Sequence, residues 1–486
     1  MDLATRIVET HISTLFFVGD RVYKVKKPLK NGFLDFTQVT ARREACRREV
    51  DLNRRLASDV YLGVADVTMD GEELEHMVVM ARLPEDRRLS TRLDLATIDD
   101  DLRHIAHLIA AFHSTTAHSA EIDAASGADA VTRLWEAGID QVGAFAGTVL
   151  DAGEVGHAAH LARGYLRGRR PLLDSRVSDG HACDGHGDLQ AEDIFVLEDG
   201  PRVLDCLEFD DLLRWGDSLS DVAFLAMDLG RLQRPDLGAR FLELYRELSG
   251  DAWPSSLAHV HIAYRAHVRA KVACLRHQQG DPGAADEARA LLRQAIDHLD
   301  AGRVRLVMVG GAPGTGKSAL SRELAERIGA VLVSSDLVRD DLFPRSTPGR
   351  DSLGEGRYTP ERVNAVYEEM TRRAELVVSH GESVVLDASW LDPEHRDMAL
   401  DLADRTSTVL TELRCDCPPE LADQRIRNRA AAGADASEIT PEIAHELIDR
   451  VARWSEAAVI DTRAPLGEAV GLAEAITTRP DPMGRC

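Results

Sequence analysis

The stretch GGAPGTGKSAL, residues 310–320, decides the fold of the second half of the chain. It matches the pattern G-x-x-x-x-G-K-[ST], follows the apolar run RVRLVMV, and opens a segment with apolar residues at helical spacing. Glycines let a backbone wrap around phosphate groups with its N–H groups pointing inward, and the start of a helix adds a favourable field. A glycine-rich turn without a ligand is the alternative, but the flanking strand and helix favour a phosphate-binding loop. Lys317 would span the terminal phosphates and Ser318 would ligate magnesium; the predicted nucleotide contacts are Gly311, Ala312, Pro313, Gly314, Thr315, Gly316, Lys317, Ser318 and Ala319.

The rhythm of the sequence around this loop divides the chain into two predicted domains. After residue 301 the short apolar strands RVRLVMV, AVLVS, ESVVLD and STVLTELRC alternate with helical segments, which indicates a doubly wound, mostly parallel α/β sheet in residues 301–486. Residues 1–85 instead predict two hairpins around one charged helix, and residues 86–300 are mainly helical. Because 486 residues are too many for one ordinary core, we expect a separate domain at 1–300. Its strands come first and its helices follow, which indicates an α+β fold.

Two acidic residues at strand ends are candidates for chemistry in the second domain. Asp336 follows the second strand, where a carboxylate could accept a proton from an attacking hydroxyl, and Asp387 ends the strand ESVVLD, where it could orient magnesium. An ordinary helix-capping Asp is an equal alternative for Asp336 and the alternative for Asp387. Arg425 and Arg429 in DQRIRNRAAAG share a helical face and could offset transition-state charge, although a solvated arginine face is the commoner arrangement.

On GGAPGTGKS, SSDLVR, VVLDAS and QRIRNR, residues 303–456 resemble the small P-loop kinases of the gluconate-kinase, adenylate-kinase and polynucleotide-kinase kind, especially a group of bacterial kinases labelled AAA-type. The resemblance implies ATP and Mg²⁺ as cofactors and phosphoryl transfer to a small acceptor. A second arginine-finger element of a ring-forming ATPase is not visible, so the label implies no remodelling activity.

A second set of candidates lies around HGDLQAEDIF, residues 186–195. Asp188 is followed five residues later by Asp193 and seventeen residues later by Asp205, which ends the strand PRVLD of a predicted hairpin. Because the hairpin begins just past Asp193, we expect the three carboxylates at one edge. Phosphoryl transfer needs one carboxylate to receive the acceptor's proton and two oxygen ligands for magnesium. A polar turn whose carboxylates cap backbone N–H groups is the alternative.

At HGDLQAEDIF, VLDCLEF and WGDSLSDVAFLAMDL, residues 1–300 resemble the aminoglycoside phosphotransferase family, which has a protein-kinase-like bilobal fold. The resemblance implies Asp188 as the catalytic base, Asp193 and Asp205 as metal ligands, and Asp221 as a brace for the catalytic loop. Two residues depart from the family pattern: Gln190 stands in place of its His, and Asp193 in place of its Asn. The second change adds negative charge beside the phosphates.

The same resemblance implies that Lys24 of RVYKVKK holds the nucleotide's phosphates and that Glu49 pairs with it. Lys26 lies on the same strand face as Lys24, so it competes for that role. Further along, Arg265 and Arg269 lie on one helical face with Lys271 beside them, which could favour an acidic or phosphorylated substrate. A solvated helix face is the preferred interpretation of these last residues.

Composition bounds the partners. The formal net charge of −24 opposes non-specific binding of nucleic acid and of anionic membranes. The seven cysteines are scattered, and neither a signal peptide nor a membrane-spanning run is visible, so we expect a cytoplasmic protein.

The sequence predicts a bifunctional ATP-dependent phosphotransferase that holds two Mg-ATP and acts on small hydroxyl-bearing metabolites. One alternative is a single P-loop kinase regulated by a degenerate N-terminal pseudokinase; another is an ATP-switched binding protein with no acceptor. Phosphorylation of polynucleotides is disfavoured by the charge. The sequence specifies neither the acceptor nor the oligomeric state.

Overall fold

The computed structural model describes residues 6–10, 12–31, 34–70, 72–344, 356–431 and 454–479. The chain forms two compact units. The first unit comprises Met1–Val155, Asp174–Trp253 and Val260–His298, and the second comprises Gly156–Leu173, Pro254–His259 and Leu299–Cys486.

The first unit opens with an antiparallel sheet of five strands in the order β1-β2-β3-β7-β6. Both predicted hairpins are present, β2 with β3 and β6 with β7. Helix α1 packs on this sheet around a core that includes Val22, Val50 and Val78, so the charged helix buries its apolar stripe. The elements are β1 (Arg6–Glu9), β2 (Ser13–Val18), β3 (Arg21–Lys26), β4 (Lys30–Asn31), β5 (Leu34–Asp35), α1 (Val39–Ala57), β6 (Tyr61–Met69) and β7 (Glu72–Ala81).

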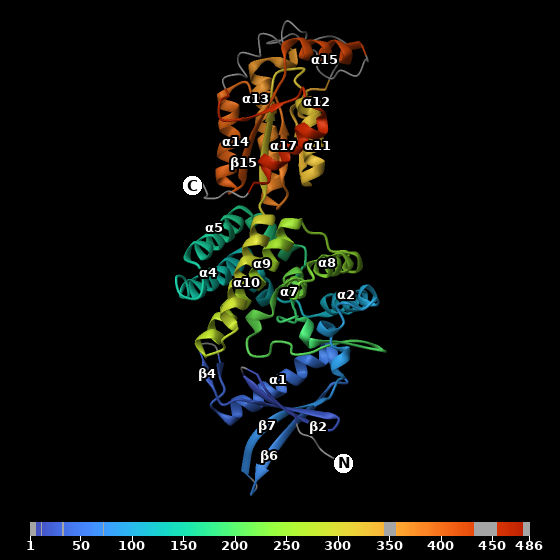
Figure 1. Cartoon of the computed structure of the whole chain (residues 1–486), viewed down its shortest axis with the longest axis vertical. Coiled ribbons are helices and arrows are strands. Elements are labelled where there is room, and N and C mark those ends of the chain that lie inside the picture. The colour runs from blue at the N-terminus through green and yellow to red at the C-terminus, as the bar shows by residue number, and fades with distance from the viewer. Residues whose placement is uncertain are drawn as a thin grey trace. The chain divides into compact units, whose positions relative to one another are not determined.

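Helices dominate the chain between residues 98 and 301, as the sequence predicts (Figure 1). Two small antiparallel pairs interrupt them, β8 with β11 and β9 with β10, and these pairs frame the stretch HGDLQAEDIF. The helices are α2 (Ile98–Thr115), α3 (Ala120–Ser126), α4 (Ala128–Gly143), α5 (Ala152–Gly168), α6 (Arg170–Ser178), α7 (Ser218–Arg231), α8 (Pro235–Ser249), α9 (Ser255–Gln278) and α10 (Ala284–Ala301). The short strands are β8 (Ala182–Asp184), β9 (Ile194–Leu197), β10 (Gly200–Val203) and β11 (Trp215–Asp217).

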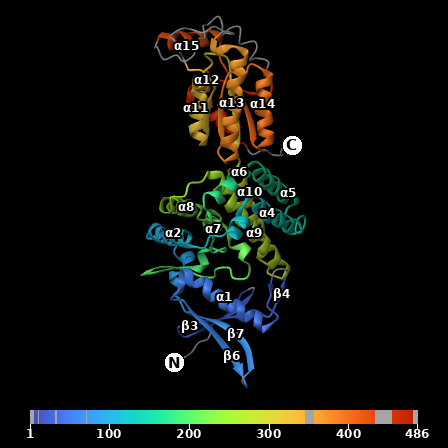
Figure 2. The ribbon, with the colours of Figure 1, turned by 180° about the vertical axis from the view of Figure 1, so that it is seen from behind.

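The second unit contains a five-stranded parallel sheet in the order β13-β14-β12-β15-β16. This confirms the predicted doubly wound sheet. Helices α11, α13 and α14 run alongside it (Figures 1 and 2). The strands are β12 (Arg305–Gly310), β13 (Val331–Ser334), β14 (Val384–Asp387), β15 (Val409–Asp416) and β16 (Ala458–Asp461). The helices are α11 (Lys317–Ile328), α12 (Ser335–Leu342), α13 (Pro360–Ser379), α14 (Pro393–Arg405), α15 (Pro419–Ala431) and α17 (Leu466–Thr477).

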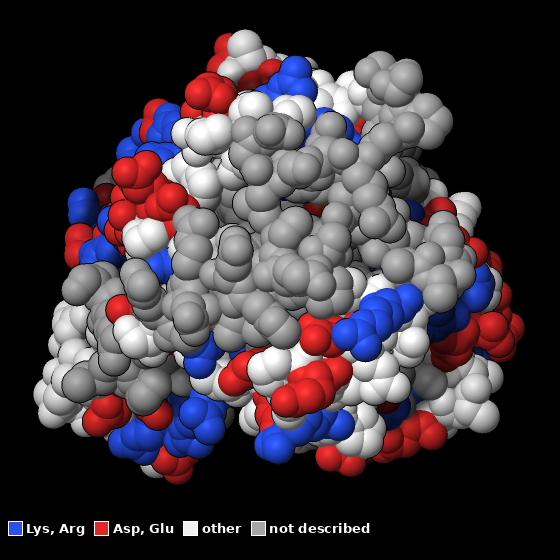
Figure 3. Space-filling view, turned by 90° about the horizontal axis from the view of Figure 1, so that it is seen from above, with Lys and Arg blue, Asp and Glu red and all other residues white. Residues whose placement is uncertain are grey.

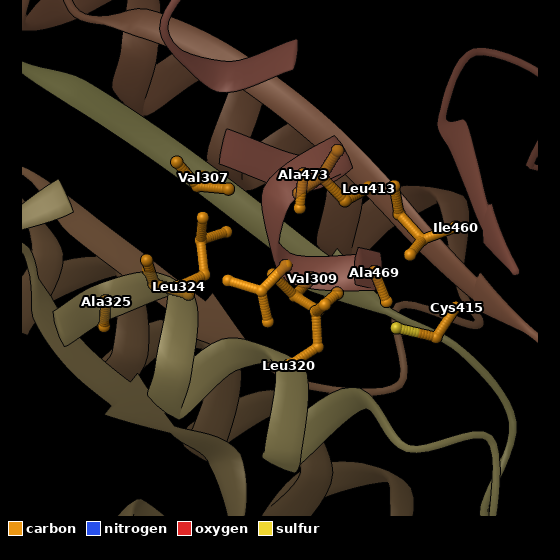
Figure 4. Close-up of a cluster of buried hydrophobic side chains, with 12 residues drawn as sticks. Val307, Val309, Leu320, Leu324, Ala325, Leu413, Cys415, Ile460, Ala469 and Ala473 are labelled. Carbon is orange, nitrogen blue, oxygen red and sulfur yellow. The ribbon is translucent and has the colours of Figure 1, made fainter. Parts of the chain in front are cut away.

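The core of the second unit fixes the position of its phosphate-binding loop. Val307 and Val309 of the central strand pack with residues of α11 and α17 in one buried cluster (Figure 4). Leu306 and Met308 alternate with them, point to the opposite face of the sheet and are also fully buried. Because β12 is clamped on both faces, the loop that leaves its carboxyl end starts from a rigid support.

The surface carries charges of both signs. On the face seen in Figure 3, Lys and Arg side chains are interspersed with Asp and Glu. Within the described ranges, helices that combine the length and the apolar character needed to cross a bilayer are absent.

Candidate active sites

The loop after β12 has the backbone that its glycines predict. Gly311, Gly314 and Gly316 have φ angles of +144°, +82° and +91°. A Cβ on Gly311 would lie 2.6 Å from Thr315 Oγ1, and one on Gly314 would lie 2.6 Å from the carbonyl oxygen of Ala422. Both positions therefore require glycine for conformation and for space. Helix α11 begins at Lys317 directly after this loop, so its free N–H groups face the space that the loop surrounds.

Two tryptophans that the sequence did not single out pack against the start of the loop. A Cβ on Gly310 would lie 2.4 Å from the ring of Trp454 and 2.9 Å from the ring of Trp390. Both indoles are buried, and Trp454 Nε1 donates a hydrogen bond of 2.9 Å to Glu412. Large aromatic side chains thus leave no room for anything but glycine where β12 ends.

Arg425 holds the loop from outside. Its guanidinium donates to Thr462 Oγ1 at 3.1 Å, to the carbonyl oxygen of Thr462 at 2.7 Å and to the carbonyl oxygen of Gly314 at 3.5 Å. Thr462 Oγ1 in turn donates to the carbonyl oxygen of Thr315 at 2.6 Å. Arg425 is therefore not a solvated side chain but lies against the loop, and Thr462 is a neighbour that its distance in sequence concealed. The prediction for Arg429 concerns a side chain that lies outside the part of the chain that the structure describes.

Asp387 faces the loop from the end of β14. Its carboxyl is buried, and this burial raises its pKa, whereas Lys317 opposes the shift and Ser318 and Ser321 hydrogen-bond to the group. Its Oδ1 atom is buried without a hydrogen-bond partner. Asp387 caps no helix, since α14 is capped by Asp392. A buried carboxylate oxygen without a partner, beside Lys317 and Ser318, fits a magnesium ion whose other ligands are phosphate oxygens and water.

Asp336 lies in the first turn of α12, where it receives an ion pair of 2.7 Å from Arg339. Ser334 is the N-cap of that helix, so Asp336 is not its cap. Its side chain is 40% exposed, and its charge acts on Asp387. The structure thus brings Lys317, Ser318, Asp336 and Asp387 to one edge of the sheet.

In the first unit, Asp221 braces the loop that carries HGDLQ, as predicted. Its carboxylate accepts the backbone N–H groups of His186 at 2.7 Å and Gly187 at 2.8 Å. The ring of His113 approaches the same carboxylate at 3.1 Å. Burial opposes ionisation of Asp221, but the hydrogen bond and charge of His113 hold its pKa well below the usual range. A carboxylate that is ionised at neutral pH therefore fixes the backbone directly before Asp188.

The hairpin β9–β10 brings the predicted acids together. Ile194 pairs with Val203, and the backbone N–H of Leu204 donates to the carbonyl oxygen of Asp193 at 2.9 Å, so Asp193 and Asp205 meet at the open end. Burial, then the charges of Asp205 and Asp188, raise the pKa of Asp193 well above its usual value. Burial also raises the pKa of Asp188 to about 6, although Arg269 opposes it. The three carboxylates are therefore close enough that the charge of one shifts the pKa of another.

Asp205 has a left-handed backbone, with φ at +63°, which is unusual for a residue other than glycine. Its N–H donates to the hydroxyl of Tyr61 at 3.1 Å, and the N–H of Cys206 donates to the side chain of Asn53 at 2.8 Å. Strain of this kind persists only where surrounding groups hold it, and it is common at functional sites. The Asp205 side chain is 48% exposed, so it reaches toward open space.

The ion pairs of Lys24 and Lys26 show which of the two lysines lies beside the metal-ligand candidates. Lys24 Nζ contacts Glu49 at 2.8 Å and also pairs with Asp205. Lys26 Nζ contacts Glu49 at 2.5 Å and pairs with Glu208, a residue that the sequence did not single out although it lies three positions after Asp205. Burial opposes the charge of Lys24, but Asp205 and Glu49 raise its pKa well above the usual value. Lys24 is the lysine beside the metal-ligand candidates.

Neither site is a closed metal centre. In the part of the chain that the structure describes, no group of three or more His, Cys, Asp or Glu residues is arranged to hold a metal ion. Magnesium in kinase sites is bound through one or two carboxylates together with substrate phosphates. The residues present, Asp193 with Asp205 and Ser318 with Asp387, therefore fit a metal that arrives with a nucleotide.

The sequence model of a family described as an AAA domain matches residues 306–453. With the glycine-rich loop at the start of α11 and the parallel sheet, this match defines the class of residues 306–453, a P-loop nucleotide-binding domain. The uncharacterized protein Rv2004c of Mycobacterium tuberculosis is 41% identical over 471 residues, which cover 96% of this chain and 94% of that protein. The uncharacterized protein Mb2027c of Mycobacterium bovis matches to the same extent. The chain belongs to the family of these mycobacterial proteins.

Solved structures resemble each part of the chain separately. A choline kinase from Cryptosporidium parvum is 9% identical and covers 61% of this chain and 86% of its own, with a TM-score of 0.39. The GDP complex of aminoglycoside 2'-phosphotransferase-IIIa is 15% identical and covers 61% and 94%, with a TM-score of 0.37. A sugar kinase from Janibacter sp. is 18% identical and covers 36% and 94%, with a TM-score of 0.28.

Proposed function

We propose that the protein is a bifunctional ATP-dependent phosphotransferase, with one Mg-ATP site in a kinase module at residues 1–300 and another in a P-loop module at residues 301–486. Both modules act on small hydroxyl-bearing metabolites. The single observation that carries the proposal is the pairing of Lys24 with both Glu49 and Asp205, beside Asp188 and Asp193. A decayed site would have no reason to keep a buried lysine between two acids, because an uncompensated buried charge is costly.

At the first site, Asp188 receives the proton of the acceptor hydroxyl. With a pKa of about 6 the carboxylate is ionised at neutral pH, yet it is a stronger base than an ordinary aspartate. Lys24 holds the phosphates of the nucleotide, and Asp193 and Asp205 hold magnesium, which neutralises their mutual repulsion. The brace on His186 and Gly187 keeps Asp188 in position while the proton moves.

At the second site, the loop residues Gly311 to Ala319 surround the phosphates, and Lys317 spans the terminal ones. Ser318 and Asp387 hold magnesium. Asp336 accepts the acceptor's proton, and Arg339 keeps that carboxylate oriented through their ion pair. Arg425, which lies against Gly314, and Arg429 offset the negative charge that develops on the phosphates.

Labelled ATP and a metabolite extract test the proposal on the full chain, with wild type, Asp188→Asn and Lys317→Ala. We expect each variant to lose a different set of labelled products by at least ~100-fold, the usual contribution of a positioned base or phosphate-binding group. Two independent losses would exclude a single active site. Labelled free phosphate with no labelled product would instead identify an ATP-switched binding protein.

A regulatory first module is the second candidate, and one observation favours it. Asp193 adds a third acid to a crowded site, and its pKa is raised well above the usual value by burial and by its acidic neighbours. A site that repels nucleotide could serve as a sensor for the P-loop module. In that case Asp188→Asn would leave all labelled products unchanged, and Lys317→Ala would remove every one.

We also place this activity in the cytoplasm. Six of the seven cysteines lie in the described ranges, and all six are free thiols, five of them buried. Free thiols suit a reducing compartment. Size-selected fractions of cell lysate, probed with an antibody against the chain, would check this placement.

A further inference from the structure

Helix α9 passes beside the loop that carries Asp188. Arg265, in the middle of this helix, donates from Nε to the carbonyl oxygen of Ser220 at 3.0 Å and from Nη1 to the carbonyl oxygen of Gly187 at 3.3 Å. Its guanidinium also lies over the ring of Phe224, 4.9 Å from the centroid. The expectation of a solvated helix face is therefore wrong for Arg265, because the helix packs this face toward the loop directly before Asp188.

Arg269 lies one turn further along the same face and is half-buried. Among the charges that act on Asp188, Arg269 is the strongest, ahead of Asp205 and Arg265. Within the described ranges its guanidinium has no hydrogen bond and no ion pair. Lys271 belongs to another face of the helix, and it is not among the charges with the largest effect on the pKa of Asp188.

The nearby acids are already engaged elsewhere. Asp228 accepts the backbone N–H of Ala191 at 2.9 Å and an ion pair of 2.8 Å from Arg231. Asp205 pairs with Lys24. Arg265 is held by the carbonyl oxygens of Ser220 and Gly187, whereas Arg269 acts on Asp188 without an ion-pair partner in the described residues. Guanidinium is the side chain best suited to bind a carboxylate or a phosphate.

A general base must lie within hydrogen-bond reach of the hydroxyl that it deprotonates. Any acceptor of the first site is therefore held beside Asp188, and so beside Arg265 and Arg269. We propose that this acceptor carries an anionic group, a carboxylate or a phosphate, which Arg269 binds with support from Arg265 while the acceptor's hydroxyl faces Asp188. This inference rests on the proposed activity of the first module.

The step balances without another reactant. The acceptor oxygen forms a bond to the γ-phosphorus of ATP, and the bond from that phosphorus to the β,γ-bridging oxygen breaks. ADP leaves with the electron pair of that bond, and the acceptor's proton passes to Asp188. The anionic group of the acceptor takes no part in bond making, so its role is to fix the position of the hydroxyl.

The test uses the full chain with Lys317→Ala, so that labelled product comes from the first module. A metabolite extract is split on an anion-exchange resin into a bound, anionic pool and an unbound pool of neutral and cationic compounds, and each is incubated with labelled ATP. Label transferred only in the anionic pool supports the inference. Label in the unbound pool overturns the inference while leaving the proposed activity intact, whereas no label in either pool overturns both.

Arg269→Gln then separates binding of the acceptor from binding of ATP. We expect its KM for the anionic acceptor to rise about 10- to 100-fold, as for loss of a charge-assisted hydrogen bond, with the KM for ATP within about twofold of the parent. Arg269→Lys should recover part of the loss. Lys271→Gln removes a cation from the same helix away from Asp188 and should change neither KM. A rise in the KM for ATP alone would assign Arg269 to the nucleotide and overturn the inference.

Discussion

Glu49 lies at the centre of a row of charges that runs from the half-exposed Asp205 through the buried Lys24 and Lys26 to the buried Glu208. Its carboxylate is fully buried, and the two ammonium groups that contact it lower its pKa although burial opposes them. Removing one partner from a buried ion pair strands the opposite charge, which is much more destabilising than the pair itself is stabilising.

We expect Glu49→Ala to destabilise the first unit by about 3–5 kcal/mol, because each of the two buried lysines then keeps only one carboxylate partner. Glu44→Ala removes an exposed acid from the same helix and should cost less than about 0.5 kcal/mol. Urea unfolding followed by circular dichroism compares the midpoints. Equal midpoints for the two variants would contradict a structural role for the row.

Asp188 predicts a pH-dependent stability. Its folded pKa of about 6 lies above the usual value of 3.8, so folding favours the protonated carboxyl. That stabilisation is complete below the unfolded pKa and is lost as pH rises through about 6. Asp188→Asn cannot ionise, so its advantage in stability should grow from about pH 4, continue to grow through pH 6 and level off by pH 7, at up to about 3 kcal/mol in total. Thermal melts at pH 5, 6, 7 and 8 check this, and an advantage independent of pH would refute it.

Sequence spacing was enough to bring Asp193 and Asp205 together, because a hairpin joins its own two ends whatever packs around it. The position of Arg269 beside Asp188 could not be predicted in the same way. Helical periodicity tells which residues share a face, but not which neighbour that face meets. Glu208 was missed for a similar reason: its partner Lys26 comes from a strand far away in the sequence.

At the scale of the element, the loop after β12 was predictable because its conformation is encoded locally by glycines and by the helix that follows. Its outer contacts were not. Gly314 lies against the backbone of Ala422, and Arg425 and Thr462 fasten the loop from α15 and from the residue after β16. These contacts depend on the parallel sheet order, which places the ends of distant strands side by side.

Gly314→Ala should therefore do more than strain the backbone. The new Cβ would lie 2.6 Å from the carbonyl oxygen of Ala422, so the loop or α15 has to move. Gly329→Ala is the matched control, since Gly329 has a φ of +62° and open space around its Cα. We expect a loss of about 1 kcal/mol for the control and at least twice that for Gly314→Ala, together with weaker ATP binding. Thermal melts with and without Mg-ATP measure both effects, and similar behaviour of the two variants would contradict the close contact.

At the scale of the whole molecule, the two compact units of the structure differ in extent from the two domains predicted from the alternation of strands and helices. The predicted boundary lies near residue 301, whereas the second unit also includes Gly156–Leu173 and Pro254–His259. Within that unit Arg169, which is 1% exposed, donates to the carbonyl oxygen of Thr406, and Ser256 Oγ donates to the carbonyl oxygen of Gly381 at 2.6 Å. Local strand and helix patterns could not reveal these contacts, because the partners lie outside the alternating region.

A fragment of residues 301–486 should therefore melt below the second unit of the full chain. It lacks the side chains that donate hydrogen bonds to the carbonyl oxygens of Thr406 and Gly381. In the full chain, Arg169→Ala should reproduce part of the loss, about 1–3 kcal/mol, since it leaves the carbonyl oxygen of Thr406 with only a long hydrogen bond of 3.4 Å from Thr408 Oγ1. The transition of this unit is the one whose shift by Mg-ATP is lost in Lys317→Ala, because the site of the first unit is unchanged in that variant. A fragment as stable as the full chain would support the predicted domain boundary near residue 301.

The two indoles packed on Gly310 give the second unit an intrinsic fluorescent probe of ligand binding. Of the five tryptophans, Trp390 and Trp454 belong to this unit, and both touch the strand end from which the phosphate-binding loop departs. Any ligand that shifts that loop alters the surroundings of two buried fluorophores. Replacing Trp135, Trp215 and Trp253 by phenylalanine would remove the tryptophan fluorescence of the rest of the chain. The emission of Trp390 and Trp454 would then follow occupancy of the second site while ligands of the first site are varied.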